Sequence, residues 1–281
     1  PYHKWEVVLD NGKKIEKTTA ELLPNDKISK LNTIVCEHGT RELPLAYGNG
    51  FFTGDGTYQS TKLSRISLYS DSKKALLHTK FEGYERYSID GSDRINVLFD
   101  RTKLKDKFFI PNSSYKLKDR LEWLAGLLDA DGCMIKFNDS YGLQLSMIEL
   151  DFMKELRLML LELGVTTNLA INRDAGFSVL PMNDGSGESK PYPTKTLYRL
   201  CISNDDICHL FDLGLVLNRI SLNKDMVRYS NYGGKRCVKV VEVVDRGEII
   251  PTYCGNEPKL HKLVFNGILG FQCVEIGVVA K

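Results

Sequence analysis

Two aspartates lie at matching positions in two similar segments of this 281-residue sequence, and their side chains could together bind a metal ion. Asp55 lies in the segment GFFTGDG of residues 50–56, and Asp131 lies in the segment GLLDADG of residues 126–132. In both segments a helical pattern of apolar residues ends at the acid, and a glycine and a strand pattern follow. The C-terminal end of a helix carries partial negative charge, so helix stability alone does not explain a carboxylate there. If the two helices pack side by side, the carboxylates repel each other until a proton or a divalent cation binds, and the pattern therefore predicts a metal site.

The residues beside the two acids favour close packing of the two helices. Each helix carries two small residues four positions apart on one face, Gly50 with Gly54 and Gly126 with Ala130. The alternative for each segment is an ordinary helix that ends in a glycine cap. The two acids are 76 positions apart, a separation that accommodates one small α/β unit. The matched small residues favour an internal duplication with a shared site over two unrelated caps.

The elements that must position these acids follow from hydrophobic periodicity. Helical spacing occurs in five segments, 44–53, 72–80, 119–129, 149–163 and 204–213. A mostly apolar run at 5–9, the turn signal at 10–12 and the returning segment 13–19 predict a β-hairpin. Alternation of apolar and polar residues predicts strands at 65–69 and 143–147. Gly164 and Gly214 should end the last two helices, and the segment 174–196, rich in Gly, Pro and Ser, should be a loop inserted in the second copy. The fold class is therefore α+β, with an all-β opening.

The charge of the chain is nearly balanced overall but is unevenly distributed. The 38 Lys and Arg residues and the 36 Asp and Glu residues give a formal net charge of +2, which by itself does not indicate a nucleic-acid binder. Residues 101–120 and 218–239 each carry a local charge of +5, whereas residues 121–162 between them carry −5. A single basic stretch is usually a solvated face. Basic stretches on both sides of the acidic residues favour a phosphate-binding surface around metal-binding carboxylates.

Composition argues against several classes of protein. No apolar stretch approaches the roughly 18 to 20 residues that span a bilayer, and the N-terminus has no signal-peptide pattern. The seven cysteines are odd in number and form no Cys-x-x-Cys pair, which argues against a disulfide framework and a zinc ribbon. We therefore expect a cytoplasmic protein in a reducing environment, with no membrane partner.

The second segment resembles a known family. Residues 124–132 read LAGLLDADG and differ at one position from the signature of the LAGLIDADG homing endonucleases. The first copy departs from it at most positions but keeps the acid and the glycine beside it. The resemblance implies a single-chain, double-motif DNA endonuclease that acts as a monomer and is built from two pseudo-twofold αββαββα repeats. It also implies that two four-stranded saddles lie in the major groove of double-stranded DNA, that Asp55 and Asp131 bind Mg²⁺, and that both strands are cut at a long site, as in intron or intein homing.

The same resemblance suggests further site residues. Family members found within inteins carry a lysine near an Ile-Pro pair just before the second motif, and Lys107, which precedes Ile110-Pro111, resembles it. Arg219 would be its counterpart after the second copy. We assign both to stabilising charge on the phosphate during cleavage; the alternatives are a simple phosphate contact and a solvated base. Polar residues on the expected strands and turns could contact bases or phosphates, although exposed sheet faces carry the same types: Lys62, Arg65, Ser67, Lys136, Gln144 and Ser146.

The two ends of the chain resemble a different unit, the protein-splicing domain of inteins. His3 resembles the His of a Thr-x-x-His block that activates the N-terminal scissile peptide, and residues 22–26 (LLPND) are similar to a Leu-x-x-Gly-Asp turn of that domain. Residues 252–254, 261–269 and 271–273 follow the order of the C-terminal splicing blocks.

This second resemblance implies chemistry at the C-terminal block. The amide of Gln272, in place of the usual Asn, would cyclise and break the peptide bond before Cys273, with His261 as acid or base. Cys273 would be the nucleophile that accepts the upstream segment. Departures from the family at Cys254, Phe271 and Gln272 predict slow C-terminal cleavage. Nothing corresponds to the block with the N-terminal nucleophile, so we expect either a truncation or a separate N-terminal intein fragment.

Together the two resemblances predict an endonuclease inserted in a discontinuous all-β splicing domain of the Hint type. The predicted parts are residues 1–43 and 233–273 for splicing, 44–232 for the endonuclease with repeats at 44–116 and 117–232, and 274–281 for the host protein. Residues 273–276 faintly resemble a ribonucleotide reductase segment. The alternative function is a DNA-binding intein, or a maturase-like RNA binder, whose nuclease has decayed and which keeps only C-terminal cleavage. The degenerate first copy motivates that alternative.

Overall fold

The chain forms two compact units. A computed structural model describes residues 2–31, 34, 38–81, 85–88, 94–138, 140–182, 187–229, 237–248 and 255–272. Unit 1 consists of residues 1–33 and 230–281, and unit 2 consists of residues 34–229.

Residues 34–43, which the sequence division placed with the splicing part, belong to unit 2. The backbone N–H of Leu43 donates to Asp119 Oδ2 at 2.7 Å, and the guanidinium of Arg41 lies 4.5 Å from the ring centre of Tyr115. These contacts bind the segment to the start of the second half of unit 2.

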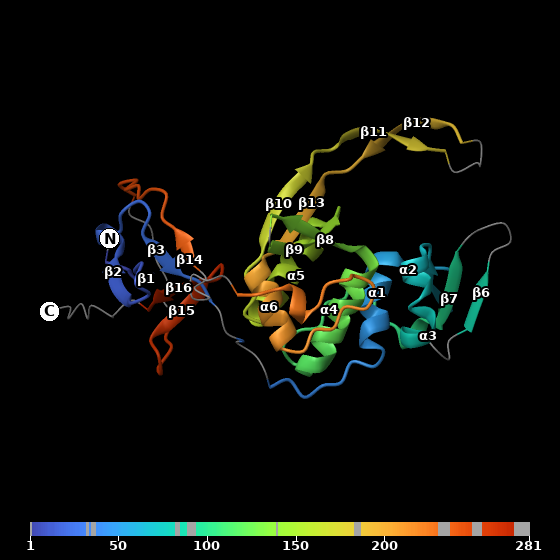
Figure 1. Cartoon of the computed structure of the whole chain (residues 1–281), viewed down its shortest axis with the longest axis horizontal. Helices are drawn as coiled ribbons and strands as arrows, with labels where there is room; N and C mark the ends of the chain where they lie inside the picture. The colour runs from blue at the N-terminus through green and yellow to red at the C-terminus, as the bar shows by residue number, and fades with distance from the viewer. Residues whose placement is uncertain are drawn as a thin grey trace. The chain divides into compact units, whose positions relative to one another are not determined.

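Unit 2 is a mixed α/β structure built from two similar halves (Figure 1). The first half contains α1 (Ala46–Asp55), β4 (Gly56–Tyr58), β5 (Leu63–Leu68), α2 (Asp71–Lys74), α3 (Leu77–Lys80), β6 (Glu85–Ser88) and β7 (Ile95–Asp100). The second half contains α4 (Leu117–Asp131), β8 (Gly132–Phe137), β9 (Ser140–Met147), α5 (Leu150–Glu162), β10 (Asn168–Arg173), β11 (Gly176–Pro181), β12 (Ser189–Thr194), β13 (Leu197–Ile202) and α6 (Asn204–Asp212). Short 3₁₀ turns lie at Arg101–Lys103 and Lys224–Met226.

The two halves carry equivalent antiparallel sheets, with strand orders β4-β5-β7-β6 and β8-β9-β13-β10. The glycine that follows each helix begins the first strand, and it pairs with Ile66 in one sheet and with Leu145 in the other. This register makes Arg65 equivalent to Gln144, and it makes Ser67 equivalent to Ser146 in the same way. The predicted internal duplication is confirmed. Gly164 and Gly214 follow α5 and α6 with positive φ angles of 79° and 104°, as predicted for the ends of these helices.

The first half departs from the predicted repeat in its helices. The periodicity over 72–80 predicts one helix, but the chain forms α2 and α3 with a turn at residues 75–76. Leu76 and Leu77 are both buried, and the turn lets two consecutive side chains reach the core, which a continuous helix does less readily. Among the described residues after β7, a 3₁₀ turn stands where the repeat would have its third helix.

The segment 174–196 is not the predicted loop, because β11 and β12 pair in it as an antiparallel hairpin. Figure 1 shows this hairpin as an arm that continues β10 and β13. The strand was not predicted because Pro191 and Pro193 lie in it. An edge strand nevertheless tolerates proline where the missing N–H would point away from the partner strand.

Glycines allow α1 and α4 to lie side by side at the centre of unit 2 (Figure 1). A Cβ atom on Gly50 would lie 1.8 Å from the Trp123 carbonyl oxygen, and one on Gly126 would lie 2.1 Å from the Tyr47 carbonyl oxygen. No side chain fits at either position, so the two backbones are in direct contact. The predicted side-by-side packing is confirmed.

Unit 1 is a β-sheet unit formed by segments from both ends of the chain. Its strands are β1 (Lys4–Val8), β2 (Lys14–Thr18), β3 (Lys27–Ser29), β14 (Cys237–Lys239), β15 (Lys262–Phe265) and β16 (Ile268–Phe271), in the order β14-β3-β1-β16-β15 with β2 paired to β1. The strands predicted at 5–9 and 13–19 match β1 and β2, which are joined by a turn with Gly12 at φ 82°. Trp5 pairs with Gly270, so the two ends share one sheet.

A buried ion-pair group predicts how the stability of unit 1 depends on pH. Glu6 is 6% exposed, and the ammonium groups of Lys14 and Lys262 each lie 2.6 Å from one of its carboxylate oxygens. Burial acts to raise the pKa of Glu6, but hydrogen bonds from the two lysines outweigh it and lower that pKa to about 2. The lowered folded-state pKa contributes about 3 kcal/mol of stability above about pH 4.5, and this contribution is lost as the pH falls toward 2.

We therefore expect amide hydrogen exchange in β1 and β16 of the intact chain to accelerate between pH 4.5 and pH 3, after correction for the intrinsic rate. Glu6→Gln should remove most of this acceleration. Glu16→Gln is the control, because Glu16 and its partner Lys4 are both half-exposed. An equal acceleration of exchange in the two variants would contradict the assignment of this pH dependence to Glu6.

Candidate active site

Asp55 and Asp131 end α1 and α4 at the point where the two helices are in contact. A Cβ atom on Gly54 would lie 2.8 Å from Asp131 Oδ2 and 2.6 Å from the Cβ of Ala130. The Asp131 carboxylate therefore sits against the residue that precedes Asp55. Burial raises the pKa of both carboxyl groups, and the negative charge of Asp131 raises that of Asp55 further. The structure brings the two predicted acids together in a setting that disfavours two unneutralised charges.

Lys73 supplies positive charge to the acid pair, and the sequence analysis did not single it out. Its Nζ lies 2.5 Å from Asp55 Oδ2, and its charge also opposes the rise in the pKa of Asp131. The hydroxyl of Ser70 accepts a hydrogen bond from the Lys73 N–H and begins α2, which sets the direction of the lysine. No sequence signal marks Lys73, because the contact depends on where β5 returns the chain to the end of α1.

Lys107 and Arg219 bind backbone carbonyl groups at the ends of the two helices, and both bind the glycine that follows the helix. The Lys107 ammonium donates to the carbonyl oxygen of Gly54 at 3.2 Å and to that of Gly56. The Arg219 guanidinium donates to the carbonyl oxygen of Leu128 at 3.2 Å and to those of Asp129 and Gly132. Positive charge at a helix C-terminus is stabilising. Burial lowers the pKa of Lys107, and the charges of Asp131 and Asp55 oppose that change.

Two further residues missed by the sequence analysis anchor the loops that carry these bases. Asp129 is fully buried and accepts hydrogen bonds from the hydroxyl of Tyr47 at 2.9 Å and from the backbone N–H groups of Asn218, Arg219 and Ile220 at 2.8, 3.0 and 3.3 Å. In the first half, Asn49 Oδ1 accepts from the backbone N–H of Lys105 at 2.6 Å. Each is a polar residue within a run of apolar residues and glycines, 46–52 for Asn49 and 123–130 for Asp129, and this is the signal that could have found both.

The predicted DNA-contacting residues differ in their accessibility. Lys62 and Lys136 are exposed, in the β4–β5 turn and on edge strand β8 respectively, while Arg65, Gln144 and Ser146 are partly exposed. Ser67 is 4% exposed and donates to Asn96 Oδ1 at 2.8 Å, so its hydroxyl is not open on the sheet surface. Arg199, which the sequence analysis missed, pairs with Ser146 across β13 and β9.

The acid pair suits a divalent cation by the chemistry of its donors. Mg²⁺ prefers carboxylate oxygens and is usually held by one or two carboxylates, with water and substrate phosphates completing its coordination. Within the described ranges, no group of three or more His, Cys, Asp or Glu side chains could hold a metal ion. Two carboxylates therefore fit an ion shared with a phosphate better than an ion enclosed by the protein.

The predicted splicing residues are placed within unit 1, except Cys273, which lies outside the described residues together with 252–254 and 274–281. Gln272 Nε2 lies 2.8 Å from His261 Nδ1, and the Gln272 backbone N–H donates to the His261 carbonyl oxygen at 2.9 Å. Burial lowers the pKa of His3, whose Nε2 would lie 2.7 Å from a Cβ atom on Gly270. Three of the four residues thus lie near the open end of the β15–β16 hairpin, where β15 begins and β16 ends.

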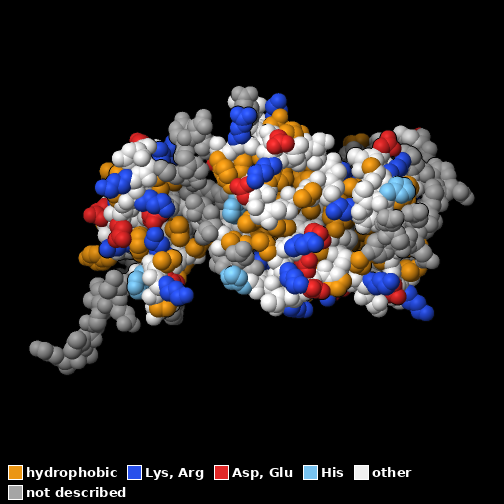
Figure 2. All heavy atoms as spheres, turned by 60° about the horizontal axis from the view of Figure 1, so that its bottom comes forward, with side chains coloured by type: hydrophobic (Ala, Val, Ile, Leu, Met, Phe, Trp, Pro, Cys, Tyr) orange, Lys and Arg blue, Asp and Glu red, His pale blue; other side chains and the backbone are white. Residues whose placement is uncertain are grey.

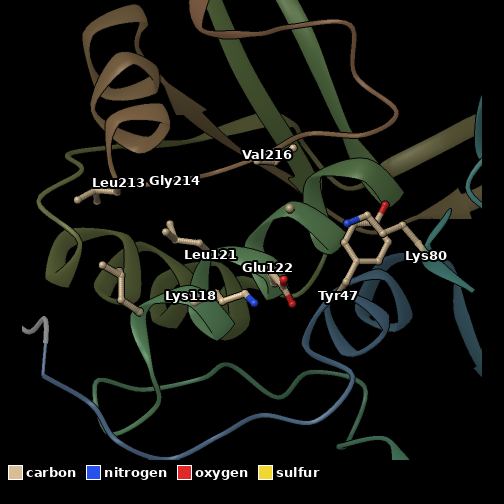
Figure 3. A pocket seen from close by; sticks show the side chains of 10 residues that line it. Tyr47, Lys80, Lys118, Leu121, Glu122, Leu213, Gly214 and Val216 are labelled. Atoms are coloured by element: carbon tan, nitrogen blue, oxygen red, sulfur yellow. The ribbon is translucent and has the colours of Figure 1, made fainter.

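A separate hollow lies at the other end of the helix pair (Figure 3). The cavity has a volume of about 460 Å³, and its lining includes Tyr47, Lys80, Leu121 and Glu122. Leu121 precedes Asp131 by ten residues, about 15 Å along a helix, so this cavity is not part of the acid pair.

On the face that Figure 2 shows, Lys and Arg side chains are interspersed with Asp and Glu side chains. The described side chains on that face form no continuous basic field of the kind that phosphate binding favours.

Three comparisons with known proteins bear on this site. Residues 118–213 match the profile described as "LAGLIDADG-like domain", which covers the second half of unit 2 from α4 to the end of α6. The chain is 36% identical over 257 residues to a ribonucleoside-diphosphate reductase large subunit of Invertebrate iridescent virus 6, covering 91% of this chain and 26% of that protein. It is 24% identical to the ribonucleoside-diphosphate reductase NrdEB subunit alpha of Bacillus subtilis (strain 168), covering 98% of this chain and 29% of that protein. The chain thus spans about a quarter of the length of the curated relatives it matches.

Solved structures that the comparison found include variants of the homing endonuclease I-DmoI, at 16% identity and a TM-score of 0.38, covering 65% of this chain and 94% of that one. The N-terminal LAGLIDADG domain of DUF199/WhiA gives 18% identity and a TM-score of 0.37, and the match covers 63% of this chain and 84% of that domain's chain. No helix in the described part of the chain is long and apolar enough to cross a membrane. The profile match to a LAGLIDADG-like domain thus coincides with the second half of unit 2, and the first half repeats the sheet order of that half.

Proposed function

We propose that unit 2 is a Mg²⁺-dependent endonuclease that cuts both strands of a specific DNA site. The observation that carries this proposal is the meeting of Asp55 and Asp131 at the ends of two packed helices, each followed by an equivalent four-stranded sheet. Two equivalent acids and two equivalent sheets suit the two antiparallel strands of a duplex. The basic stretches at 101–120 and 218–239, which contain Lys107 and Arg219, favour phosphate as the ligand.

The residues of the site have distinct roles in this proposal. Asp55 and Asp131 would hold Mg²⁺, which when bound polarises a phosphate and lowers the pKa of a water molecule. Lys107 and Arg219 hold the carbonyl ends of α1 and α4, and so fix the two acids relative to each other. Lys73 neutralises part of the charge on the pair in the absence of DNA.

The test is cleavage of the host gene without its intein coding sequence, across the junction that ends in the Cys273 codon. We expect a linear product from a plasmid that carries the junction, in Mg²⁺ but not in EDTA. Binding without cutting, with log K falling linearly with log salt and no response specific to Mg²⁺, would instead support the alternative of a DNA-binding element with a decayed nuclease.

We further propose that unit 1 performs intein chemistry and that the host is a large subunit of ribonucleotide reductase. The similarity to two such subunits over about a quarter of their length, and the contact of Gln272 with His261, support this proposal. The backbone N–H of Glu257 donates to Gln272 Oε1 at 2.7 Å, which leaves the side-chain nitrogen facing the imidazole. The working protein would be a monomer in the cytoplasm, with double-stranded DNA as its partner.

The intein proposal predicts which peptide bond breaks. In a chain with the host sequence restored after residue 281, cleavage should occur between Gln272 and Cys273, and intact mass measurement should detect both fragments. Gln272→Ala should abolish this cleavage, because alanine has no amide nitrogen to cyclise. His261→Ala should slow it by about 10²-fold or more, the usual contribution of a positioned acid or base. Cleavage that persists in Gln272→Ala would contradict the assigned chemistry.

A further inference from the structure

The β11–β12 hairpin is a direct continuation of the sheet in the second half of unit 2. Arg173 of β10 pairs with Leu197 of β13, and the same register continues in the hairpin as Gly176 with Thr194 and Phe177 with Pro193. No residue is inserted on either side between the two ladders. The hairpin is therefore a two-stranded ribbon that lengthens only this sheet, since the described strands of the first half have no counterpart to it.

The side chains of the ribbon are sorted between its two faces. Phe177 and Val179 are 77% and 70% exposed, and their cross-strand neighbours are Pro193 and Pro191. These four residues share one face, because cross-strand partners and alternate residues of a strand point to the same side. Ser178 and its partner Tyr192 occupy the other face, with the Lys190 ammonium 5.1 Å from the Tyr192 ring centre.

By the same alternation, the apolar face of the ribbon continues the face of the sheet that points away from the core. Leu200 of β13 is buried in the core, so its neighbour Arg199 points to the outer face, and so does Leu197 with its partner Arg173. Beyond Gln144 and Ser146, this face carries first two arginines, Arg199 and Arg173. The apolar pairs of the ribbon follow them. None of the 24 residues in β10, β11, β12 and β13 is acidic.

This arrangement fits nucleic acid better than a further protein strand. A two-stranded ribbon alone is at best marginally stable in water, so its exposed apolar face calls for a partner. The two prolines of β12 lack backbone donors, which weakens that strand as an edge for pairing with another protein. The major groove of B-DNA accepts a two-stranded β-ribbon, and apolar side chains contact the methyl group of thymine there.

We propose that the β11–β12 ribbon lies in the major groove beyond the part of the target covered by the second sheet, and that Phe177 and Val179 contact thymine methyl groups. The inference rests on the proposed DNA-binding function and adds an asymmetric boundary to the site. Six residues per strand at about 3.3 Å each lengthen the contact by about 20 Å, or about six base pairs at 3.4 Å per pair. The target should therefore extend about six base pairs further from the cleavage point on one side than on the other.

The test uses a duplex isolated from a randomised library by the full chain in Ca²⁺. Hydroxyl-radical footprinting then compares the parent with a variant in which 176–194 is replaced by Asn-Gly, a two-residue turn that suits the register between residues 175 and 195. We expect this variant to lose about six base pairs of protection at one end only. A second measurement replaces thymine by deoxyuridine in that outer segment, which removes only methyl groups. Affinity of the parent should fall about fourfold for each contacted methyl, whereas Phe177→Ser with Val179→Ser should show no such fall.

Ile171→Ser is the matched control, because Ile171 is 58% exposed in β10, before the register shift that precedes Arg173, and its partner Tyr198 points to the opposite face from Leu197. It should keep the full footprint and the response to deoxyuridine. Unchanged protection after removal of the ribbon would overturn the inference and leave the proposed endonuclease intact. A changed oligomeric state without a changed footprint would also overturn it, in favour of a protein contact. Failure of the parent to select any duplex would overturn both proposals.

Discussion

Replacing Asp55 or Asp131 with asparagine should lower the single-turnover rate of DNA cleavage by about 10³-fold or more. Each substitution removes one of two carboxylates at the contact between α1 and α4, and asparagine keeps the shape of the side chain without its charge. Metal stabilisation of a reacting phosphate amounts to several kcal/mol, and each 1.36 kcal/mol corresponds to a factor of ten in rate. Asp131→Asn should fold normally, because burial raises the pKa of this acid and so disfavours its charged form. Asp55→Asn removes the ion-pair partner of Lys73, so its urea unfolding is measured beside its cleavage rate.

The control is Asp151→Asn, at an exposed acid in α5 whose ion-pair partner is Lys154 in the same helix. It should cleave at the parental rate. DNA binding in Ca²⁺ should be retained in all three variants to within about tenfold, which separates a loss of chemistry from a loss of binding. Parental cleavage by Asp131→Asn would show that the site is assigned to the wrong residues.

Gly50→Ala should destabilise unit 2 by about 3 kcal/mol, a large effect for the addition of one methyl group. The new Cβ atom would lie 1.8 Å from the Trp123 carbonyl oxygen and 2.9 Å from the Leu127 nitrogen. Both atoms belong to the backbone of α4, so no side chain can move aside, and the helices must separate. The same separation would pull Asp55 away from Asp131, so cleavage should fall as well.

Gly48→Ala is the matched control in the same helix. A Cβ atom there would meet Phe99 at 3.8 Å and Leu45 at 3.9 Å, which are ordinary van der Waals contacts. Alanine also has a higher helix propensity than glycine, by up to about 1 kcal/mol, so this variant should be as stable as the parent or more stable. Urea unfolding of the three proteins measures the difference. Equal midpoints for Gly48→Ala and Gly50→Ala would contradict backbone contact as the basis of the helix pair.

The sequence predicted the parts of unit 2 that depend on local patterns. The helices that end at Asp55 and Asp131, their small residues and their spacing all repeat over short segments, so one chain sufficed to predict that the helices pack together. Lys107 and Arg219 were found through a family resemblance, and each donates to the carbonyl oxygen of the glycine that follows its helix, Gly56 or Gly132. The common strand order of the two sheets could not be predicted from local patterns, because strand order depends on pairing between distant segments.

The residues that the sequence missed act through contacts between distant segments. Lys73 meets Asp55 only because a strand and a turn bring α2 back to the end of α1. Asp129 accepts hydrogen bonds from a loop about 90 residues later in the chain. The donors are backbone N–H groups, so the types of the side chains in that loop do not indicate the contact. The ribbon was missed for a different reason, since the prolines and glycines that usually mark a loop are here compatible with an edge strand.

Anomalous scattering from Mn²⁺ in crystals of the chain bound to its target duplex tests most directly whether Asp55 and Asp131 form one metal-binding centre on DNA. The account predicts an anomalous peak at about 2.1 Å from a carboxylate oxygen of each aspartate, with a phosphate oxygen in the same coordination sphere. A duplex bound across the two sheets without such a peak, and with Lys73 still paired to Asp55, would contradict it.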